Sequence, residues 1–273
     1  MKKAVRLGGF FYYLCIIMKE LLVRTLSGAV LVAVIVTCIL VSRWTMDALA
    51  MFIIVVGTYE MARLQQVEDT WLLVLVELMA AGAFLLFAHL IVVFLALPLF
   101  MFPFLLALFS KKYDFKTMAA FAFGSLAFLS LPCAFMVWIH QFGPLWLLLV
   151  FVLLWVNDTF AYLTGRLLGK HKLFERISPG KTIEGSIGGL MFTMAGIMVF
   201  SHYVDWLSWY QALGMGLIAV IFGTLGDLCE SMLKRQAGVK DSGKLIPGHG
   251  GILDRFDSVL FAVPFVYVYL FLI

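Results

Sequence analysis

Long apolar runs alternate with short polar connections along most of this chain. Each run is close to the about 20 residues that an α-helix needs to cross a bilayer core, and none shows the strict alternation of an outer-membrane β-strand. The pattern predicts an all-α integral membrane protein with nine transmembrane helices. The predicted spans are 25–42, 46–62, 71–88, 90–109, 118–139, 145–164, 185–203, 209–228 and 256–273.

The basic residues support this number of crossings. If the nine spans alternate in direction, every one of the 20 Lys and Arg residues except Arg43 falls on the same side. Basic loops stay in the cytoplasm, so the N-terminus is predicted to be cytoplasmic and the C-terminus to lie outside. The sequence therefore indicates a multi-pass protein of the inner (cytoplasmic) membrane of the cell.

Composition agrees with a membrane location. Hydrophobic residues make up 63% of the chain and charged residues 13%, whereas about a quarter of a soluble domain is charged. Residues 1–17 combine a basic start with a short apolar stretch and no small-residue cleavage site. They are expected to be an interfacial lead-in, or an extension upstream of a start at Met18, rather than a cleaved signal. The four cysteines form no C-x-x-C pair, which argues against a disulfide framework or a zinc site.

Polar chemistry is confined to the second half of the chain. Residues 1–142 have small loops and few ionisable groups within their spans, so this half is predicted to be mainly structural. Residues 143–273 carry two long cytoplasmic loops, 165–184 and 229–255, and place acids at or inside helix ends. This half is predicted to be catalytic.

Two pairs of acids flank the loop 229–255. Asp227 and Glu230 are three residues apart on one helical face, and Asp254 and Asp257 repeat this spacing at the start of the last span. A carboxylate beside hydrocarbon is costly unless it is paired or binds a cation. We therefore expect Asp227 and Asp254 to hold Mg²⁺, which would also bind substrate phosphates.

The loop between the acid pairs is suited to phosphate. Glycines at 243, 248, 250 and 251 let backbone amides approach phosphate oxygens without an intervening side chain. Its cations are Lys234, Arg235, Lys240 and Lys244. Simpler interpretations stay open. Water or Lys234 could satisfy Asp227, the helix N-terminus could stabilise Asp257, and His249 is equally consistent with a phosphate contact or a turn residue.

The loop 165–184 carries a second set of polar residues. Its Gly180-Lys181-Thr182 sequence is not a Walker A motif, because position 175 is Glu where the motif requires Gly. We expect Ser178 to cap or precede the next helix, Pro179 to set its start, and Lys181, Thr182 and Glu184 to face one polar cavity. Upstream, Asp158 lies within a span beside Asn157. It is a candidate functional residue, or else an interhelical hydrogen-bond partner or a partner of Arg166.

The run 231–257 has the order Ser231-x-x-Lys234-Arg235-x4-Lys240-Asp241-x-Gly243-x3-Pro247-x-His249-Gly250-Gly251-x2-Asp254-Arg255-x-Asp257. It resembles the signature of the phosphatidate cytidylyltransferases, also called CDP-diacylglycerol synthases. The segments 157–162 and 178–185 are similar to that family too, so the resemblance covers about the last 120 residues. It implies that CTP and phosphatidic acid condense to CDP-diacylglycerol and pyrophosphate at the membrane.

The resemblance also implies roles for individual residues. The expected catalytic residues are Asp227, Asp254, Lys234, Lys240 and Asp241. The expected nucleotide- and phosphate-binding residues are Ser178, Lys181, Thr182, Arg235, His249, Gly250, Gly251 and Arg255. The expected metal ligands are Asp227 and Asp254, with Asp158, Glu230 and Asp257 as further candidates. The family resemblance also implies Mg²⁺, a second cation such as K⁺ and a homodimer. A nucleic acid is not expected as a partner.

Three other functions share part of this pattern. A CTP-dependent polyprenol or phytol kinase would also couple CTP to a membrane lipid, but it would need a base for its alcohol nucleophile. A CDP-alcohol phosphotransferase is disfavoured because its D-G-x2-A-R motif is absent. An ion-coupled transporter could use Asp158 and Asp227 in broken helices, but the charges gather on one face and no inverted repeat is visible.

Overall fold

The computed structural model describes residues 2–67, 108 and 114–273, and the side chains of most residues before 21 are not described. The predicted spans 71–88 and 90–109 therefore lie outside the described residues, apart from residue 108. Seven helical segments in the described part are long and apolar enough to cross a membrane. Each overlaps one of the seven other predicted spans. The protein is therefore a multi-pass helical membrane protein.

The described helices follow one another as α1 (Lys2–Val41), α2 (Arg43–Leu64), α6 (Phe115–Ser125), α7 (Leu131–Phe142), α8 (Pro144–Leu168), α9 (Ile183–Tyr203), α10 (Trp209–Gln236) and α11 (Leu253–Leu272). A π-helical turn, Leu126–Ser130, joins α6 to α7 just before Pro132, whose missing N–H interrupts the regular helical hydrogen bonds. Ser42 separates α1 from α2 and caps α2 by accepting a hydrogen bond from the Thr45 amide at 3.2 Å.

A short β-hairpin within the loop 165–184 is a departure from the all-α prediction. Strands β1 (Lys172–Phe174) and β2 (Ser178–Thr182) pair in antiparallel fashion. Ser178 precedes the next helix, as one of the two predicted alternatives, but the prediction that Pro179 sets the helix start is wrong, because both residues lie in β2. Helix α9 instead begins at Ile183, and its N-cap Thr182 accepts a hydrogen bond from the Gly185 amide at 3.1 Å.

Small residues set the spacing between the helices of the second half. A Cβ atom at Gly189 of α9 would lie 2.6 Å from Asn157 Oδ1 and 3.0 Å from Ala161 Cβ of α8. A Cβ at Gly226 of α10 would lie 2.6 Å from the Asp257 carbonyl of α11. Glycine therefore permits the close approach of α9 to α8 and of α11 to α10, which is typical of helix pairs in membranes.

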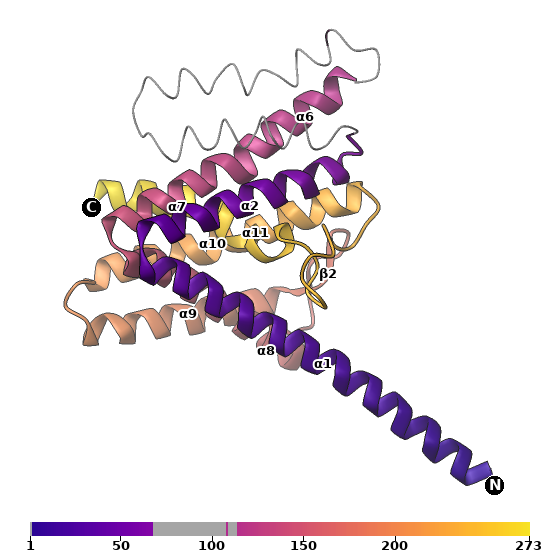
Figure 1. Ribbon diagram of the computed structural model, residues 1–273. Coiled ribbons are helices and arrows are strands. Elements are labelled where there is room, and N and C mark those ends of the chain that lie inside the picture. Colours follow the sequence, from indigo (N-terminus) through magenta and orange to yellow (C-terminus); the bar gives the residue numbers. More distant parts are fainter. Residues whose placement is uncertain (1, 68–107, 109–113) are drawn as a thin grey trace.

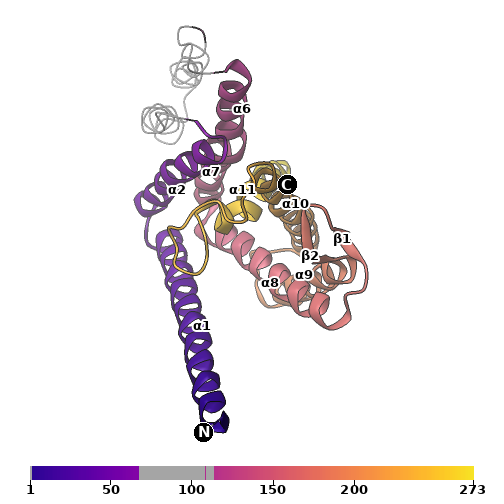
Figure 2. The same cartoon turned by 90° about the vertical axis from the view of Figure 1, so that its right-hand side faces the viewer.

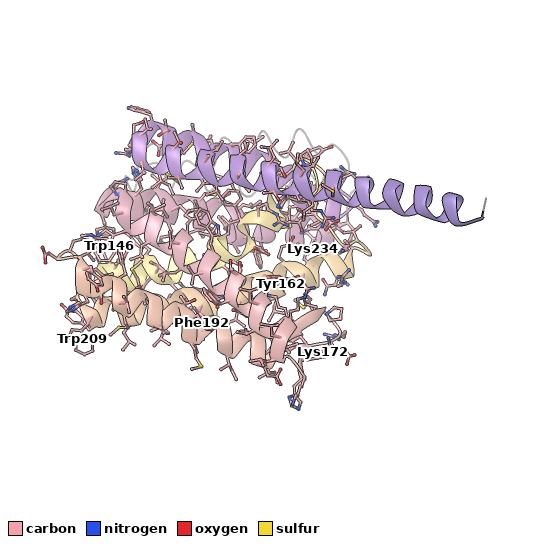
Figure 3. The ribbon with its side chains drawn as sticks, turned by 90° about the horizontal axis from the view of Figure 1, so that it is seen from below. Trp146, Tyr162, Lys172, Phe192, Trp209 and Lys234 are labelled. Carbon is pink, nitrogen blue, oxygen red and sulfur yellow. The ribbon has the colours of Figure 1, made fainter. Side chains whose placement is uncertain are left out.

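The bundle has one polar end. The C-terminal ends of α2, α8 and α10 meet the N-terminal ends of α9 and α11 there, together with the hairpin (Figures 1 and 2). Seen from below, Lys172 and Lys234 lie toward this end, whereas Trp146 and Trp209 lie at the other (Figure 3). Aromatic side chains gather at membrane–water interfaces, so the two ends are chemically distinct.

Substituting Gly189 tests the α8–α9 packing. We expect Gly189→Leu to overpack the interface and destabilise the fold by about 1–3 kcal/mol, seen as a lower thermal unfolding midpoint in detergent. The matched control is Gly196→Leu on the same helix, where a Cβ atom meets nothing within 4 Å. Equal midpoints for the two variants would contradict the packing role of Gly189.

Candidate functional site

A cavity of about 700 Å³ opens at the polar end of the bundle, between β2 and helices α8 to α11. It is large enough for a small molecule the size of a nucleotide. Acids and bases line it in equal number: Asp158, Asp227, Asp254 and Asp257 with Arg166, Lys181, Lys234 and Arg255. Ser178 and Thr182 lie in the same wall. Segments far apart in the sequence thus bring most of the predicted polar residues to one space.

Asp227 is paired with the hairpin rather than with Lys234. Lys181 of β2 places its Nζ 2.5 Å from Asp227 Oδ2, and the Ser231 hydroxyl donates to Asp227 Oδ1 at 3.2 Å. Both side chains are about one quarter exposed to the cavity. The pair is therefore accessible to a ligand, and Lys181 connects the hairpin to α10.

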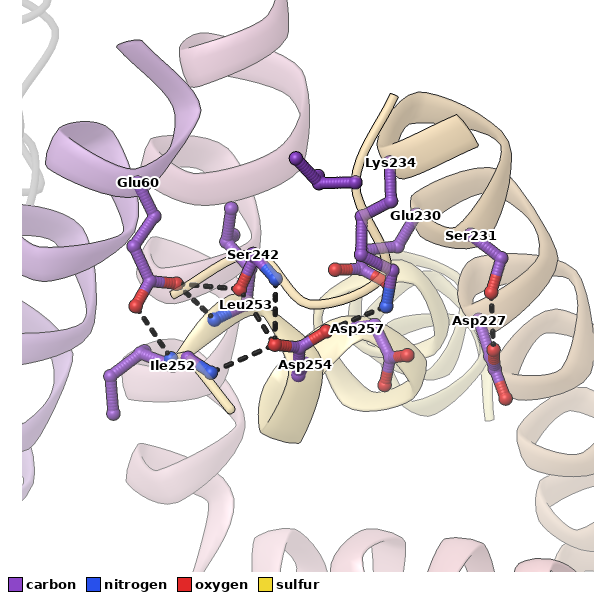
Figure 4. Close-up of polar contacts among 12 residues, drawn as sticks. Glu60, Asp227, Glu230, Ser231, Lys234, Ser242, Ile252, Leu253, Asp254 and Asp257 are labelled. Atoms are coloured by element: carbon purple, nitrogen blue, oxygen red, sulfur yellow. Dashed lines mark hydrogen bonds and ion pairs between the residues drawn. The ribbon is translucent and has the colours of Figure 1, made fainter. Parts of the chain in front are cut away.

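Lys234 joins α10 to α11. Its ammonium group forms ion pairs with Glu230 on its own helix and with Asp254 Oδ1 at 2.6 Å (Figure 4). The three side chains are almost entirely shielded from solvent. Two carboxylates share one cation here, so removing Lys234 would leave both buried acids without the cation that compensates their charge.

Asp254 also organises the loop that precedes α11. Its Oδ2 atom accepts hydrogen bonds from the Ser242 amide at 2.8 Å, the Ser242 hydroxyl at 3.0 Å and the Gly251 amide at 2.8 Å. With Lys234 on Oδ1, both carboxylate oxygens have partners. Asp254 therefore closes the loop between α10 and α11 in addition to lining the cavity.

Glu60 of α2 is a buried acid that sequence reasoning missed. Its side chain is 3% exposed and accepts hydrogen bonds from the amides of Ile252 and Leu253, each at 3.0 Å, and from the Ser242 hydroxyl at 2.9 Å (Figure 4). The two amides open α11, so the negative charge also interacts favourably with the helix dipole. Its position inside the apolar run 46–62, whose other acid is Asp47 at the opposite end, was the signal that could have revealed it. The half predicted to be mainly structural thus reaches the site.

The glycines of this loop make room for carboxylates. A Cβ atom at Gly243 or Gly251 would collide with the Glu60 carboxylate, and one at Gly250, where φ is +85°, would lie 2.5 Å from Asp254 Oδ2. The amides of residues 251–253 donate to these same acids. The phosphate contacts expected of Gly250 and Gly251 stay predictions, while their packing against Asp254 and Glu60 is observed.

Lys240 and Asp241 do not line the main cavity. They border a separate pocket of about 540 Å³ together with Arg63 and Lys244. Arg235 lines neither of these two spaces. Its guanidinium donates to the carbonyls of Ile177 and Val239, each at 3.3 Å. Arg235 therefore anchors the hairpin turn to the end of α10.

His249 and Glu184 also have local partners. The His249 ring places Nδ1 2.8 Å from the Ser27 hydroxyl of α1, so the loop before α11 rests on the first helix. Burial, followed by the charge of Arg255, lowers the pKa of His249 below its ordinary value, which leaves the ring neutral at physiological pH. Glu184 was expected in the cavity, but its carboxylate instead accepts hydrogen bonds from Lys170 and His171.

Asp158 and Asp257 leave room for a cation. Among the described residues, neither forms an ion pair with a Lys or Arg. Asp158 accepts only a long hydrogen bond of 3.4 Å from Asn157, and Asp257 accepts one from the Ser258 amide at 2.6 Å. Asp257 lies within electrostatic range of Asp227 and Asp158. No group of three His, Cys, Asp or Glu residues in the described part is arranged to hold a metal alone. The residues fit an ion such as Mg²⁺, which commonly takes one or two carboxylates and completes its shell with phosphates and water.

The fold and this cavity define a polytopic membrane protein with a charged pocket at one end of its helices. The chain belongs to the cytidylyltransferase family, whose sequence model matches residues 22–273. It is 46% identical over 153 residues to the phosphatidate cytidylyltransferases of Staphylococcus aureus and Staphylococcus haemolyticus, and 43% identical to that of Staphylococcus epidermidis. Each alignment covers 56% of this chain and 59% of the relative.

Replacing Glu60 tests its hold on the loop before α11. We expect Glu60→Gln to place an amide group against N–H donors and to weaken a charge-assisted contact of about 1.5–3 kcal/mol. Local opening of the loop should then rise at least tenfold, measured as faster tryptic cleavage after Lys240 and Lys244 in detergent. Glu175→Gln, at an exposed turn of the hairpin, is the matched control. Cleavage at the wild-type rate in Glu60→Gln would refute this role.

Proposed function

We propose that this protein transfers the cytidylyl group of CTP to phosphatidic acid, forming CDP-diacylglycerol and pyrophosphate at the cytoplasmic side of the cell membrane. The main supporting observation is the cavity at one end of the apolar helices, where four acids and four bases from distant segments converge. Such a position is open to a soluble nucleotide and adjacent to lipid. The staphylococcal relatives are named phosphatidate cytidylyltransferases, which is consistent with the proposed activity.

The proposed reaction mainly requires that two anions, the lipid phosphate and the triphosphate of CTP, be aligned. A phosphate monoester has its second pKa near 6, so the lipid phosphate is largely dianionic at neutral pH and needs no strong base. One of its oxygens bonds to the α-phosphorus of CTP as the bond from that phosphorus to the β-phosphate bridging oxygen breaks. Pyrophosphate leaves with the bonding electrons. The cations of the cavity would hold the triphosphate and stabilise the departing charge.

Lys181 and Asp227 are placed to respond to the nucleotide. Without ligand they neutralise each other across 2.5 Å. When the triphosphate arrives, Lys181 would exchange the Asp227 carboxylate for a phosphate oxygen, leaving Asp227 free to bind a cation. Arg255 and Arg166 also line the cavity, and no carboxylate pairs with either within the described part of the chain, so both are available to phosphate.

The cavity acids would hold Mg²⁺ during this reaction. Asp257 and Asp158 are candidates, and so is Asp227 once Lys181 has turned to phosphate. Asp254 is held more firmly, by Lys234 on Oδ1 and by three hydrogen bonds on Oδ2. The metal would neutralise the triphosphate and support departure of pyrophosphate. A second cation such as K⁺ and a homodimer stay predictions.

Product labelling tests the reaction and excludes the kinase alternative. Purified protein incubated with phosphatidic acid and CTP should transfer label from the α-phosphate of CTP to the lipid, in a magnesium-dependent manner. A CTP-dependent lipid kinase would transfer label from the γ-phosphate instead. Label from the γ-phosphate alone, or no labelled lipid, would refute the proposed function.

Asp227→Asn tests the role of the acid beside Lys181. We expect kcat to fall about 10²- to 10³-fold, the usual loss when one charge-stabilising group is removed, with an unchanged unfolding midpoint. The magnesium concentration for half-maximal activity should also rise. Asp205→Asn, in the exposed connection between α9 and α10, is the control. Wild-type kcat and magnesium dependence in Asp227→Asn would remove this residue from the site.

A further inference from the structure

The pocket bordered by Lys240 and Lys244 is a second cavity at the polar end of the bundle. Its volume is about 540 Å³, it lies between the end of α2 and the segment that follows α10, and it shares no lining residue with the main cavity. Its described lining contains three bases, Arg63, Lys240 and Lys244, and one acid, Asp241. The main cavity has four of each. An excess of positive charge therefore distinguishes this pocket.

The cations of the pocket are open to a ligand. Among the described residues, no carboxylate forms an ion pair with Lys240 or Lys244, and both residues are exposed. The Arg63 guanidinium lies over the Tyr59 ring, 5.9 Å from its centroid, which orients the side chain. An anion that enters the pocket therefore meets two lysines that it need not displace from other described acids.

The two helix ends beside the pocket have carbonyls that are already hydrogen-bonded. Free carbonyls give the C-terminal end of a helix its partial negative charge, which would repel an anion. Here the carbonyls of residues 61–63 accept from the amides of residues 65–67, and those of residues 233–235 accept from the amides of residues 237–239, at 2.9–3.1 Å. The repulsion is thereby reduced, and the cations dominate the pocket.

We propose that this pocket binds a phosphate-bearing anion at a site separate from the main cavity. Arg63 would hold phosphate oxygens through its planar fork of N–H donors, and the two lysines would add charge. The pocket is larger than a phosphate ion, so it has room for a glycerol or sugar unit, whose hydroxyl groups would donate to Asp241. An anionic lipid headgroup and a soluble phosphate share this chemistry. The proposal does not depend on the proposed reaction, and it assigns Lys240 and Asp241 to a second site.

Ser242 connects this pocket to the acids of the neighbouring loop. It lines the pocket, and its hydroxyl donates toward Glu60 at 2.9 Å and Asp254 at 3.0 Å. Gly243, the next residue, packs against the Glu60 carboxylate. A bound anion would therefore restrain residues 240–244 and, through Ser242, the loop that Glu60 and Asp254 hold.

Limited tryptic digestion in detergent tests the site with inorganic phosphate as the probe. Millimolar phosphate should slow cleavage after Lys240 and Lys244 at least fivefold, while cleavage after the exposed Arg176 of the hairpin stays unchanged. Arg63→Gln should lose most of this protection, although both cleavage sites remain. Lys244→Gln should lose it at Lys240 as well, which gives a second variant if Arg63→Gln folds poorly. Arg176→Gln, a matched loss of charge outside the pocket, should keep it.

Nanodiscs distinguish the two sources of phosphate. Protein in phosphatidylcholine nanodiscs that contain phosphatidylglycerol, without free phosphate, should show the same protection if a lipid headgroup fills the pocket. Protection by free phosphate alone would identify a soluble ligand. The proposal is overturned if neither probe protects the two sites, if wild type and Arg63→Gln are protected equally, or if sodium chloride at the same ionic strength slows cleavage as much as phosphate, since that effect is only screening.

Discussion

The structure depends on one constraint: each buried carboxylate at the polar end needs a hydrogen-bond donor or a cation beside it. An ionised acid among apolar helices is unfavourable by several kcal/mol unless it is compensated. Lys234 compensates Glu230 and Asp254, and backbone amides at the start of α11 compensate Glu60. These contacts fold the loop between α10 and α11 back onto the bundle, and the walls of both cavities follow from that position.

The two halves of the chain are joined through this loop. Glu60 of α2 and Ser27 of α1 both contact it, although they lie about two hundred residues earlier in the sequence. The first two helices therefore do more than fill the membrane. Through Ser242, which donates toward both Glu60 and Asp254, a change in α2 reaches an acid that lines the cavity.

The placement of the charges suits a reaction between partners of different solubility. The main cavity is ringed by polar groups, whereas a smaller space of about 220 Å³ between α1, α8 and α11 becomes apolar toward the edge of the bundle. Arg255 and three acids separate the two. Under the proposed function, the soluble nucleotide would reach these charges from the polar end of the bundle.

The sequence by itself predicted the seven spans that the described helices overlap and the resemblance of the run 231–257, because hydrophobic period and motif spacing are local properties. It also predicted most of the acids and bases that line the main cavity, including Asp227, Lys181 and Arg255. Only the tertiary structure decided their partners. It paired Asp227 with Lys181 of the hairpin, placed Lys240 and Asp241 in another pocket and brought Glu60 to α11. Such contacts depend on how helices distant in sequence pack, and no local pattern encodes that packing.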